Sequence, residues 1–307
     1  MDPRISDLSQ DTNYMEFKLS GVNVSIANAL RRIILSEIPT VVFRTSPHER
    51  NLVNFDINTS RMNNELIKQR LSCIPIHIVD PDFPIKDYII ELNVLNETDS
   101  IIYATTNDFT ITNINNNKTL TKSDVNKIFP PDPITNDYIE IIRLRPKISD
   151  VVNGEHIKFS AELDIATAKE DSAFNVVSTC SYGASVDSLK INQTWSNIMK
   201  ELKATGKSKD DIDSYKKDWL LLDAKRLIVK DSFNFKIESV GPFSEMSIVY
   251  KGAYVMINKL KKFSDNLQTD ENMIMESNST IQHCFDITLI DEDYTLGKVL
   301  EYILYEK

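Results

Sequence analysis

The hydrophobic residues near the start of the chain change from a two-residue period to a helical period. Phe17 and Leu19 alternate with polar residues, which predicts a strand with one buried face. From about residue 25 to residue 37, apolar residues recur every three or four positions, which predicts an amphipathic helix that a proline ends. Asn23 or Ser25 can cap this helix with a side-chain oxygen. The predicted apolar face consists of Ile26, Ala27, Leu30, Ile33 and Ile34.

The same pattern returns at the end of the chain. A short alternating segment, residues 285–289, again precedes a helical pattern, residues 294–307. A shift of 270 positions aligns the two helices and pairs chemically similar residues: Ser25 with Thr295, Ile26 with Leu296, Ala27 with Gly297, Leu30 with Leu300, Ile33 with Ile303, and Ile34 with Leu304. One folding unit used twice is typical of modules that pack on each other or on a partner chain. The pattern therefore favours an assembly protein over an enzyme.

The middle of the chain has a different pattern. Prolines separate short strand-like runs, and residues 157–165 alternate clearly between apolar and polar. Residues 107–137 are polar and contain several prolines, so we expect an exposed loop there. Residues 190–228 are charged and helix-like, with Trp195 and Trp219 as expected packing anchors. The pattern predicts an inserted, mostly β domain with helical additions over residues 47–228.

A second strand and a long helix follow this insert. Residues 233–240 alternate, and residues 244–267 place apolar side chains at intervals of three and four. This is the spacing of a seam between packed helices. The helix could be a core helix of its own domain, an interface helix, or both. The seam consists of Met246, Val249, Ala253, Met256, Leu260, Phe263 and Leu267, and a polar linker is expected over residues 268–280.

Composition narrows the class of protein. The formal net charge of −10 argues against broad binding to nucleic-acid phosphates, although a local basic patch is compatible with it. No apolar run approaches the roughly 20 residues of a membrane helix, and the polar N-terminus lacks a signal-peptide pattern. We therefore expect an intracellular protein without a membrane partner. The three cysteines lie far apart, which predicts reduced thiols and no disulfide or metal framework.

The candidate catalytic motifs are weak. Residues 204–208 resemble the end of a phosphate-binding loop, but Glu201 stands where that loop requires glycine, so we predict a turn between helices. The four histidines have no ligand spacing. Residues 291–293, Asp-Glu-Asp, could suggest a metal site, but we expect them at the N-terminus of the last helix, where carboxylates are stabilised. The sequence predicts neither a catalytic residue nor a cofactor.

Three segments resemble the platform subunits of multisubunit RNA polymerases, namely the bacterial alpha subunit, the archaeal D-like subunit and the third-largest eukaryotic subunit. Residues 15–40 contain the run Asn28-Ala29-Leu30-Arg31-Arg32, followed by Ser36-Glu37-Ile38-Pro39. Residues 58–78 resemble a segment of that family's insert domain, and residues 233–243 resemble the return into its dimerisation domain. Many archaeal and eukaryotic members carry a cysteine cluster in the insert. Here Cys73 and Cys180 are isolated, so no such site is expected.

The last segment resembles a different kind of subunit. Residues 285–300 are similar to the small archaeal L-like partner, although Tyr294 and Lys298 stand where histidine and asparagine are common. Two halves of a heterodimer on one chain resemble the fused platform subunit of large cytoplasmic DNA viruses. The L-like part ends after one strand and one helix. We expect either that the sequence is incomplete or that another chain supplies the rest.

The resemblance implies an α+β fold: an alpha-subunit-like dimerisation domain in two parts (1–46 and 229–270), interrupted by a mostly β insert (47–228) and followed by a linker and the beginning of a second αβ module (271–307). It implies a non-catalytic assembly subunit of a DNA-directed RNA polymerase, located in host cytoplasm, virion or nucleus. Expected partners are the second-largest subunit, small subunits and an L-like half-platform in cis or in trans, with DNA contacted only through the complex.

The resemblance also assigns residues. It places the large-subunit contact on Asn28, Leu30, Arg31 and Arg32, and an arginine pair suits this role because guanidinium groups bind carboxylates bidentately. The second repeat has Glu301 and Tyr302 in place of the arginines, so only the first repeat should bind the large subunit. The expected dimerisation residues are Ile26, Ile33, Ile34, Met246, Val249, Ala253, Met256, Leu260, Phe263, Leu296 and Leu300. The alternatives are a free-standing homodimeric interaction protein and, less favoured, an enzyme in the insert.

Overall fold

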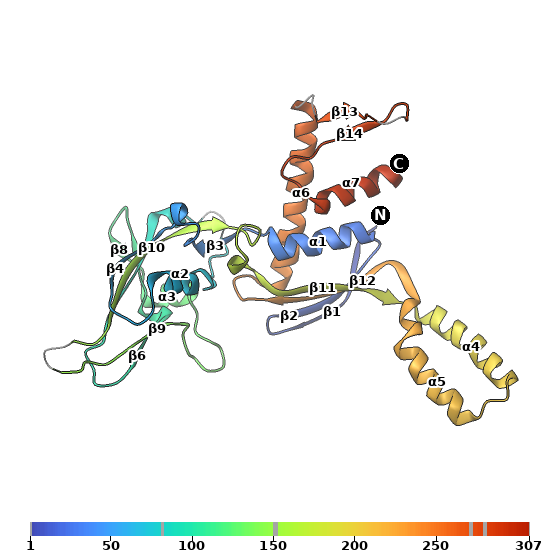
Figure 1. Ribbon diagram of the computed structural model, residues 1–307, viewed down its shortest axis with the longest axis horizontal. Coiled ribbons are helices and arrows are strands. Elements are labelled where there is room, and N and C mark those ends of the chain that lie inside the picture. The colour runs from blue at the N-terminus through green and yellow to red at the C-terminus, as the bar shows by residue number, and fades with distance from the viewer. Residues whose placement is uncertain (1, 81–82, 150–152, 270–272, 279–280, 307) are drawn as a thin grey trace. The chain divides into compact units, whose positions relative to one another are not determined.

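The structure is a computed structural model that describes residues 2–80, 83–149, 153–269, 273–278 and 281–306 (Figure 1). The chain forms two compact units. Unit 1 consists of Met1–Ile33, Thr179–Glu238 and Met256–Lys307, and unit 2 consists of Ile34–Ser178 and Ser239–Val255. Residues 179–228, expected in the insert, thus belong to the same unit as both repeats. The mixed α and β architecture predicted from the sequence is confirmed.

Unit 1 is built around a four-stranded antiparallel sheet. Its strands β1 (Arg4–Asp11), β2 (Tyr14–Ser20), β12 (Ile228–Ser239) and β11 (Val177–Val186) lie in the order β1-β2-β12-β11. Phe17 on β2 is the register partner of Phe235 on β12, and their rings stack at 5.2 Å. The alternation predicted for both strands is confirmed, because every second residue is buried: Met15, Phe17, Leu19, Phe233, Phe235 and Ile237.

Helix α1 (Val24–Ser36) lies next to β11 and β12 (Figure 1). Ala27 and Ala29 are almost completely buried, as is Ile33. Small side chains at the first two positions let the helix backbone approach its neighbours closely. The predicted start of the helix is also confirmed, since the Asn23 side chain accepts a hydrogen bond from the amide of Ser25 at 2.9 Å.

Two helices form a hairpin between β11 and β12. α4 (Ser188–Ala204) and α5 (Lys209–Leu221) pack through Trp195 and Trp219, whose ring centroids are 5.6 Å apart. The hydroxyl of Ser208 caps α5. The segment that resembles a phosphate-binding loop is therefore the turn between two helices, as predicted, and both tryptophans are the packing anchors expected.

The remaining elements of unit 1 are the second half of α6 (Glu245–Thr269) and the second repeat. The second repeat contains the two-stranded pair β13 (Ile274–Glu276) and β14 (Phe285–Ile287), followed by α7 (Tyr294–Glu306). Helices α1 and α7 contain 13 residues each and begin 270 positions apart. The helical part of the predicted repeat is confirmed.

Unit 2 contains the mostly β part of the chain. Its six-stranded sheet has the order β3-β10-β5-β7-β8, with β4 also paired to β10, and β6 pairs with β9. The strands are β3 (Thr40–Phe43), β4 (Val53–Asn58), β5 (Tyr88–Leu95), β6 (Ile102–Thr105), β7 (Thr110–Asn113), β8 (Lys118–Thr119), β9 (Glu140–Leu144) and β10 (His156–Ala166). The helices of unit 2 are α2 (Asn64–Ser72) and α3 (Lys122–Ile128). Its short 3-10 helices are η1 (His48–Arg50), η2 (Ile85–Asp87), η3 (Thr106–Asp108) and η4 (Ser172–Phe174). A further 3-10 helix, η5 (Asp223–Arg226), belongs to unit 1.

The core of unit 2 corrects one sequence prediction. Residues 107–137 are not simply an exposed loop, because they contain β7, β8 and α3. Phe109 and Phe129 are each 1% exposed and contact each other with ring centroids 5.0 Å apart, and both pack near Phe43. A few well-spaced aromatic side chains therefore bury a segment whose average composition is polar.

The long helix α6 buries a different face from the predicted seam in its first turns. Its fully buried residues are Glu245, Ile248 and Gly252, whereas Met246 and Ala253 are exposed. In the first turns of α6, the residues of the predicted seam therefore do not form the buried face of the helix. None of the helices in the described part of the chain combines the length and hydropathy needed to cross a bilayer.

Candidate interface between the two repeated helices

The two repeated helices begin with equivalent side-chain caps. Asn23 caps α1, and Asp293, one repeat length later, accepts a 2.8 Å hydrogen bond from the amide of Thr295 at the start of α7. Asparagine and aspartate are the strongest N-cap residues. The acidic run 291–293 therefore lies at the N-terminus of the last helix, as predicted.

Arg32 joins the two repeats. Its Nη2 donates to the Asp293 carboxylate at 2.7 Å, and its Nε donates to the Thr295 hydroxyl at 2.7 Å. Figure 1 shows α1 and α7 side by side at this contact. Thr295 is 1% exposed, so its hydroxyl needs a partner within the protein. The arginine of the first repeat thus recognises the capped N-terminus of the second helix.

A second ion pair supports the same arrangement. Lys259 on α6 binds Glu292 at 2.7 Å, and both side chains are less than one-fifth exposed. Beside it lies a hollow of about 240 Å³, whose lining includes Phe263, Leu289 and Leu296. The second repeat is therefore attached to α6 by an ion pair and by apolar side chains.

Arg31 has a different environment from Arg32. Its Nε and Nη2 both donate to the Asn28 side-chain oxygen, at 3.1 and 3.0 Å, on the same helix. Arg31 also lies near Cys180 on β11. Burial raises the pKa of that thiol to about 12, and the positive charge of Arg31 opposes only part of this increase. Asn28 holds the guanidinium in a fixed orientation, and Asn28, Leu30 and Arg31 are all partly exposed.

The structure separates the expected contact residues into three groups. Leu296, Ile33 and Ile34 are buried. Partly exposed are Ile26, Asn28, Leu30, Arg31, Arg32, Val249, Met256, Leu260, Phe263 and Leu300, and exposed are Met246 and Ala253. Neither the contact of Arg32 with Asp293 nor that of Lys259 with Glu292 was predicted from the sequence. The equivalence of Asn23 and Asp293 in the repeat was the signal that could have identified the cap.

We expect acid to weaken the contact between the helices. Partial burial alone would raise the pKa of Asp293, but hydrogen bonds from Thr295 and the Arg32 guanidinium outweigh it and lower the pKa from 3.8 to about 2. The stabilisation is therefore complete above about pH 4 and is lost as the pH falls through about 2. Because the pair is partly exposed, it should contribute less than about 1 kcal/mol.

The matched variant is Asp293→Asn, which keeps a capping side chain, as at Asn23, and removes the charge. Thermal unfolding of wild type and variant should differ at pH 5 and converge toward pH 2. A difference that is the same at pH 5 and pH 2 would contradict this assignment.

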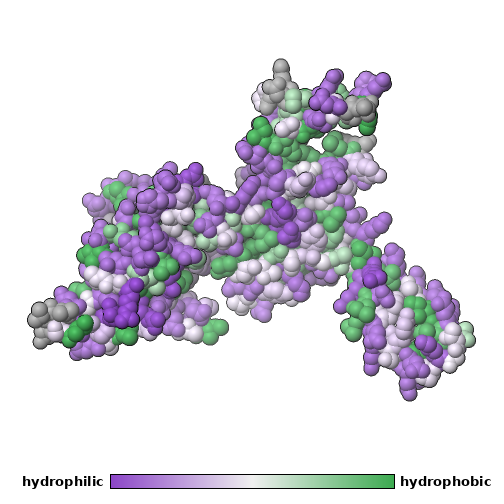
Figure 2. Space-filling model, viewed as in Figure 1, coloured by the Kyte–Doolittle hydropathy of each residue, from purple (hydrophilic) through white to green (hydrophobic). Residues whose placement is uncertain are grey.

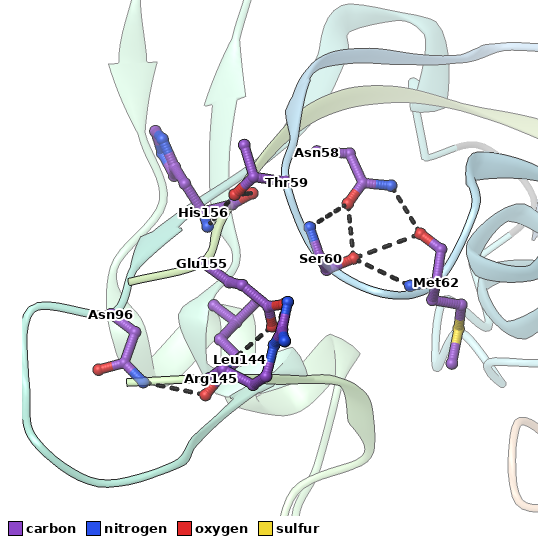
Figure 3. A network of polar contacts seen from close by, with 9 residues as sticks. All are labelled: Asn58, Thr59, Ser60, Met62, Asn96, Leu144, Arg145, Glu155 and His156. Carbon is purple, nitrogen blue, oxygen red and sulfur yellow. Dashed lines mark hydrogen bonds and ion pairs between the residues drawn. The ribbon is translucent and has the colours of Figure 1, made fainter. Parts of the chain in front are cut away.

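Unit 2 contains a larger hollow, of about 410 Å³, that bears on the enzyme hypothesis. Glu155 lies in its wall, where its carboxylate accepts hydrogen bonds from the Arg145 side chain at 2.5 Å and the Arg145 amide at 2.8 Å. Asn96 binds the Leu144 carbonyl at 2.9 Å (Figure 3). Arg70 donates to two backbone carbonyls of β9, those of Glu140 and Ile141. These groups fix strands and loops to one another.

The residues described as lining this hollow include no histidine, cysteine, serine or lysine. Nearby, Ser60 and Asn58 form a loop network in which Asn58 binds the Met62 carbonyl, and the amide of His156 donates to the Thr59 hydroxyl (Figure 3). A nucleophile paired with a base is thus not found in the wall.

The three cysteines are free thiols that differ in exposure: Cys180 is buried, Cys284 is half-buried and Cys73 is exposed. Within the described ranges, no three histidine, cysteine or acidic side chains are grouped so that they could hold a metal ion.

Comparison with known proteins decides the family. Residues 16–260 match the RNA polymerase Rpb3/Rpb11 dimerisation domain. The chain belongs to this family. The match begins in β2 and ends within α6, so it contains α1, most of the sheet of unit 1 and all of unit 2.

Several members of this family are similar over most of the chain. The DNA-directed RNA polymerases I and III subunit rpac1 of Dictyostelium discoideum is 28% identical over 291 residues, covering 83% of this chain and 79% of the relative. The subunit Rpo3 of Pyrococcus horikoshii is 26% identical over 287 residues, covering 86% and 98%. The match to the human RPAC1 subunit is shorter but more similar: it is 41% identical over 78 residues, which are 25% of this chain and 20% of the relative.

Proposed function

We propose that this chain is a non-catalytic assembly subunit of a DNA-directed RNA polymerase. Its relatives are subunits of such enzymes, and the matched domain is one that dimerises. In this proposal the chain forms a platform through its αβ modules and then binds the second-largest catalytic subunit. Catalytic residues lie in other subunits.

The observation that carries the proposal is the pairing of the two repeats. In two-chain platforms of this family, dimerisation joins two related modules. Here α1 and α7 have the same length and equivalent caps and are joined through Arg32 and Asp293. We infer that α7 and its hairpin act as an L-like half-platform in cis, as in the fused subunit of large cytoplasmic DNA viruses. Transcription in host cytoplasm, virion or nucleus is compatible with this role.

In this proposal the two arginines have different roles. Arg32 is committed to the second repeat by two hydrogen bonds. Arg31 is oriented by Asn28 and is partly exposed, so its guanidinium is preorganised to bind a carboxylate. We propose that Asn28, Leu30 and Arg31 contact the second-largest subunit. In this proposal Arg32 holds α7 against α1 and does not contact that subunit directly.

Native mass measurement distinguishes this function from the alternative of a free-standing homodimer. Chain purified at native abundance through an affinity tag should migrate with the two largest polymerase subunits in one assembly, because a platform is held by stable interfaces. Recovery only as a dimer of about twice 35.1 kDa would support the alternative and contradict the proposal.

A further inference from the structure

Two neighbouring hollows in unit 2 combine apolar walls with arginines. The hollow of about 410 Å³ adjoins a second one of about 500 Å³, because Met62, Arg70 and Glu140 line both. Most of the lining residues lie on α2 and β9 or directly beside these elements. Both volumes are in the range of ligand pockets, roughly 300–1,000 Å³. The two hollows together form the α2–β9 groove.

The groove contains apolar side chains that the chain does not cover. Leu66 on α2 is 51% exposed, and Ile101 beside β6 and Ile139 beside β9 are also exposed. Over β6 and β9, Figure 2 shows hydrophobic residues interspersed with strongly hydrophilic ones. Exposed apolar side chains rimmed by polar residues are typical of a surface that binds another molecule.

The charge of the groove differs from that of the whole chain. The chain has a net charge of −10, whereas the wall of the 410 Å³ hollow carries four arginines and two glutamates. Two of these arginines are already bonded within the chain. Arg145 pairs with the Glu155 carboxylate (Figure 3), and Arg70 donates to two carbonyls of β9. The negative charge of Glu155 is thereby compensated.

The other two arginines, Arg61 and Arg143, are accessible to a ligand. The Arg143 side chain is 67% exposed, and its Nε lies 3.9 Å from the Glu140 carboxylate, so this pair is weak. Arg61 is exposed and forms no hydrogen bond or ion pair with the residues that the structure describes. A guanidinium group binds a carboxylate through two parallel hydrogen bonds.

We propose that the α2–β9 groove binds an acidic peptide segment of a partner protein. A carboxylate of the segment contacts Arg61 and Arg143, and a large apolar side chain occupies the 500 Å³ hollow beside Leu66 and Ile139. This inference rests on the groove alone and does not depend on the polymerase function.

The composition of the wall favours a peptide over a nucleic acid. Single-stranded nucleic acids bind mainly through phosphates and through bases stacked on aromatic rings. The residues described as lining the two hollows include no aromatic side chain. Glu140 would in addition repel a phosphate backbone, whereas the aliphatic wall matches an apolar side chain.

The test measures binding of short peptides to the full chain. The probe is a fluorescein-labelled, amidated peptide of sequence GDFEDLEDFG, whose fluorescence anisotropy should show saturable binding. Replacing its apolar residues by serine, or its acidic residues by lysine, should weaken binding by about tenfold or more, because the groove offers both apolar and cationic groups. A labelled oligothymidylate of similar length should bind no better than the serine peptide.

Variants of exposed residues assign the binding to the groove. Arg61→Glu and Arg143→Glu should each weaken binding of the acidic peptide by about tenfold and strengthen binding of the lysine peptide. Leu66→Ser should weaken binding of both peptides. The matched control is Arg50→Glu, which reverses the same charge at an exposed position of unit 2 outside the groove and should have no effect. An unchanged unfolding temperature shows that each variant is folded.

Amide hydrogen exchange then locates the peptide. Saturating peptide should slow exchange over residues 62–74 and 139–145 and should leave residues 15–19 in unit 1 unchanged. Protection only outside the groove, or no saturable binding of the acidic peptide, would overturn the proposal. Equal binding of the acidic and serine peptides would reduce the interaction to charge attraction, and tighter binding of the oligothymidylate would assign the groove to nucleic acid. Either result would also overturn it.

Discussion

Alanine at both Asn28 and Arg31 is expected to reduce recovery of the second-largest RNA polymerase subunit with this chain by about 100-fold or more. In the proposed complex, the Arg31 guanidinium would form a buried, charge-assisted contact with the second-largest subunit. Removing one partner of such a contact leaves the other charge unpaired, at a cost of about 3–5 kcal/mol. The unfolding temperature should change little, because both side chains are partly exposed and bond mainly to each other. Quantitative pull-down from cells that express tagged chain measures the effect.

Two controls make this result specific. Arg50→Ala removes a positive charge from an exposed position in unit 2, where the Arg50 guanidinium lies 3.9 Å from the Glu170 carboxylate. This variant should not change recovery of the second-largest subunit. Arg32→Ala should loosen α7, seen as faster amide exchange over residues 294–306, and should reduce recovery less than the double variant. Full recovery with Asn28 and Arg31 both replaced would remove them from the proposed large-subunit surface.

Phe235→Ala is expected to cause the largest loss of stability in unit 1. Phe235 is fully buried at the centre of the four-stranded sheet, where it stacks on Phe17 and contacts the ring of Tyr182. Replacing a buried phenylalanine by alanine costs about 3–5 kcal/mol through lost burial and the cavity that remains. For a unit of this size, the loss corresponds to roughly 10–20 °C in unfolding temperature, measured by calorimetry.

Phe285→Ala is a control on β14, a strand of the second repeat. Its ring is about half exposed in the chain alone, so its removal should change the unfolding temperature by no more than a few degrees. Equal losses for the two variants would mean that β14 is as well covered as β12, contrary to the structure.

The sequence predicted those elements whose stability depends on local patterns. The strand and helix of each repeat, the hairpin anchored by Trp195 and Trp219, and the turn at residues 204–208 follow from periodicity and caps that act over a few residues. Residues 107–137 were mispredicted, because Phe109 and Phe129 gain their burial from Phe43, about 65 or more residues away in the chain. Composition averaged over a segment does not reveal such contacts.

The candidate interface was predictable only in part. The resemblance placed Asn28 and the two arginines in one group, but helical position alone could not predict that Arg31 bonds to Asn28 whereas Arg32 bonds to Asp293 and Thr295. Arg32 meets Asp293 across 261 residues of sequence, and no local pattern specifies that distance. For α6, the seam spacing predicted an amphipathic helix, but the buried face is displaced by one residue at Glu245, Ile248 and Gly252.

The helical hairpin between β11 and β12 has a practical consequence. The backbone amide of Asp187 binds the carbonyl of Leu227 at 2.8 Å, so the chain leaves the sheet and returns to it at nearly the same point. The tip of this appendage is a short turn around Gly206, which has a positive φ of 75° and open space around it. An epitope or fluorophore inserted there would be carried by the hairpin alone, and it would offer a purification handle that leaves both chain ends native.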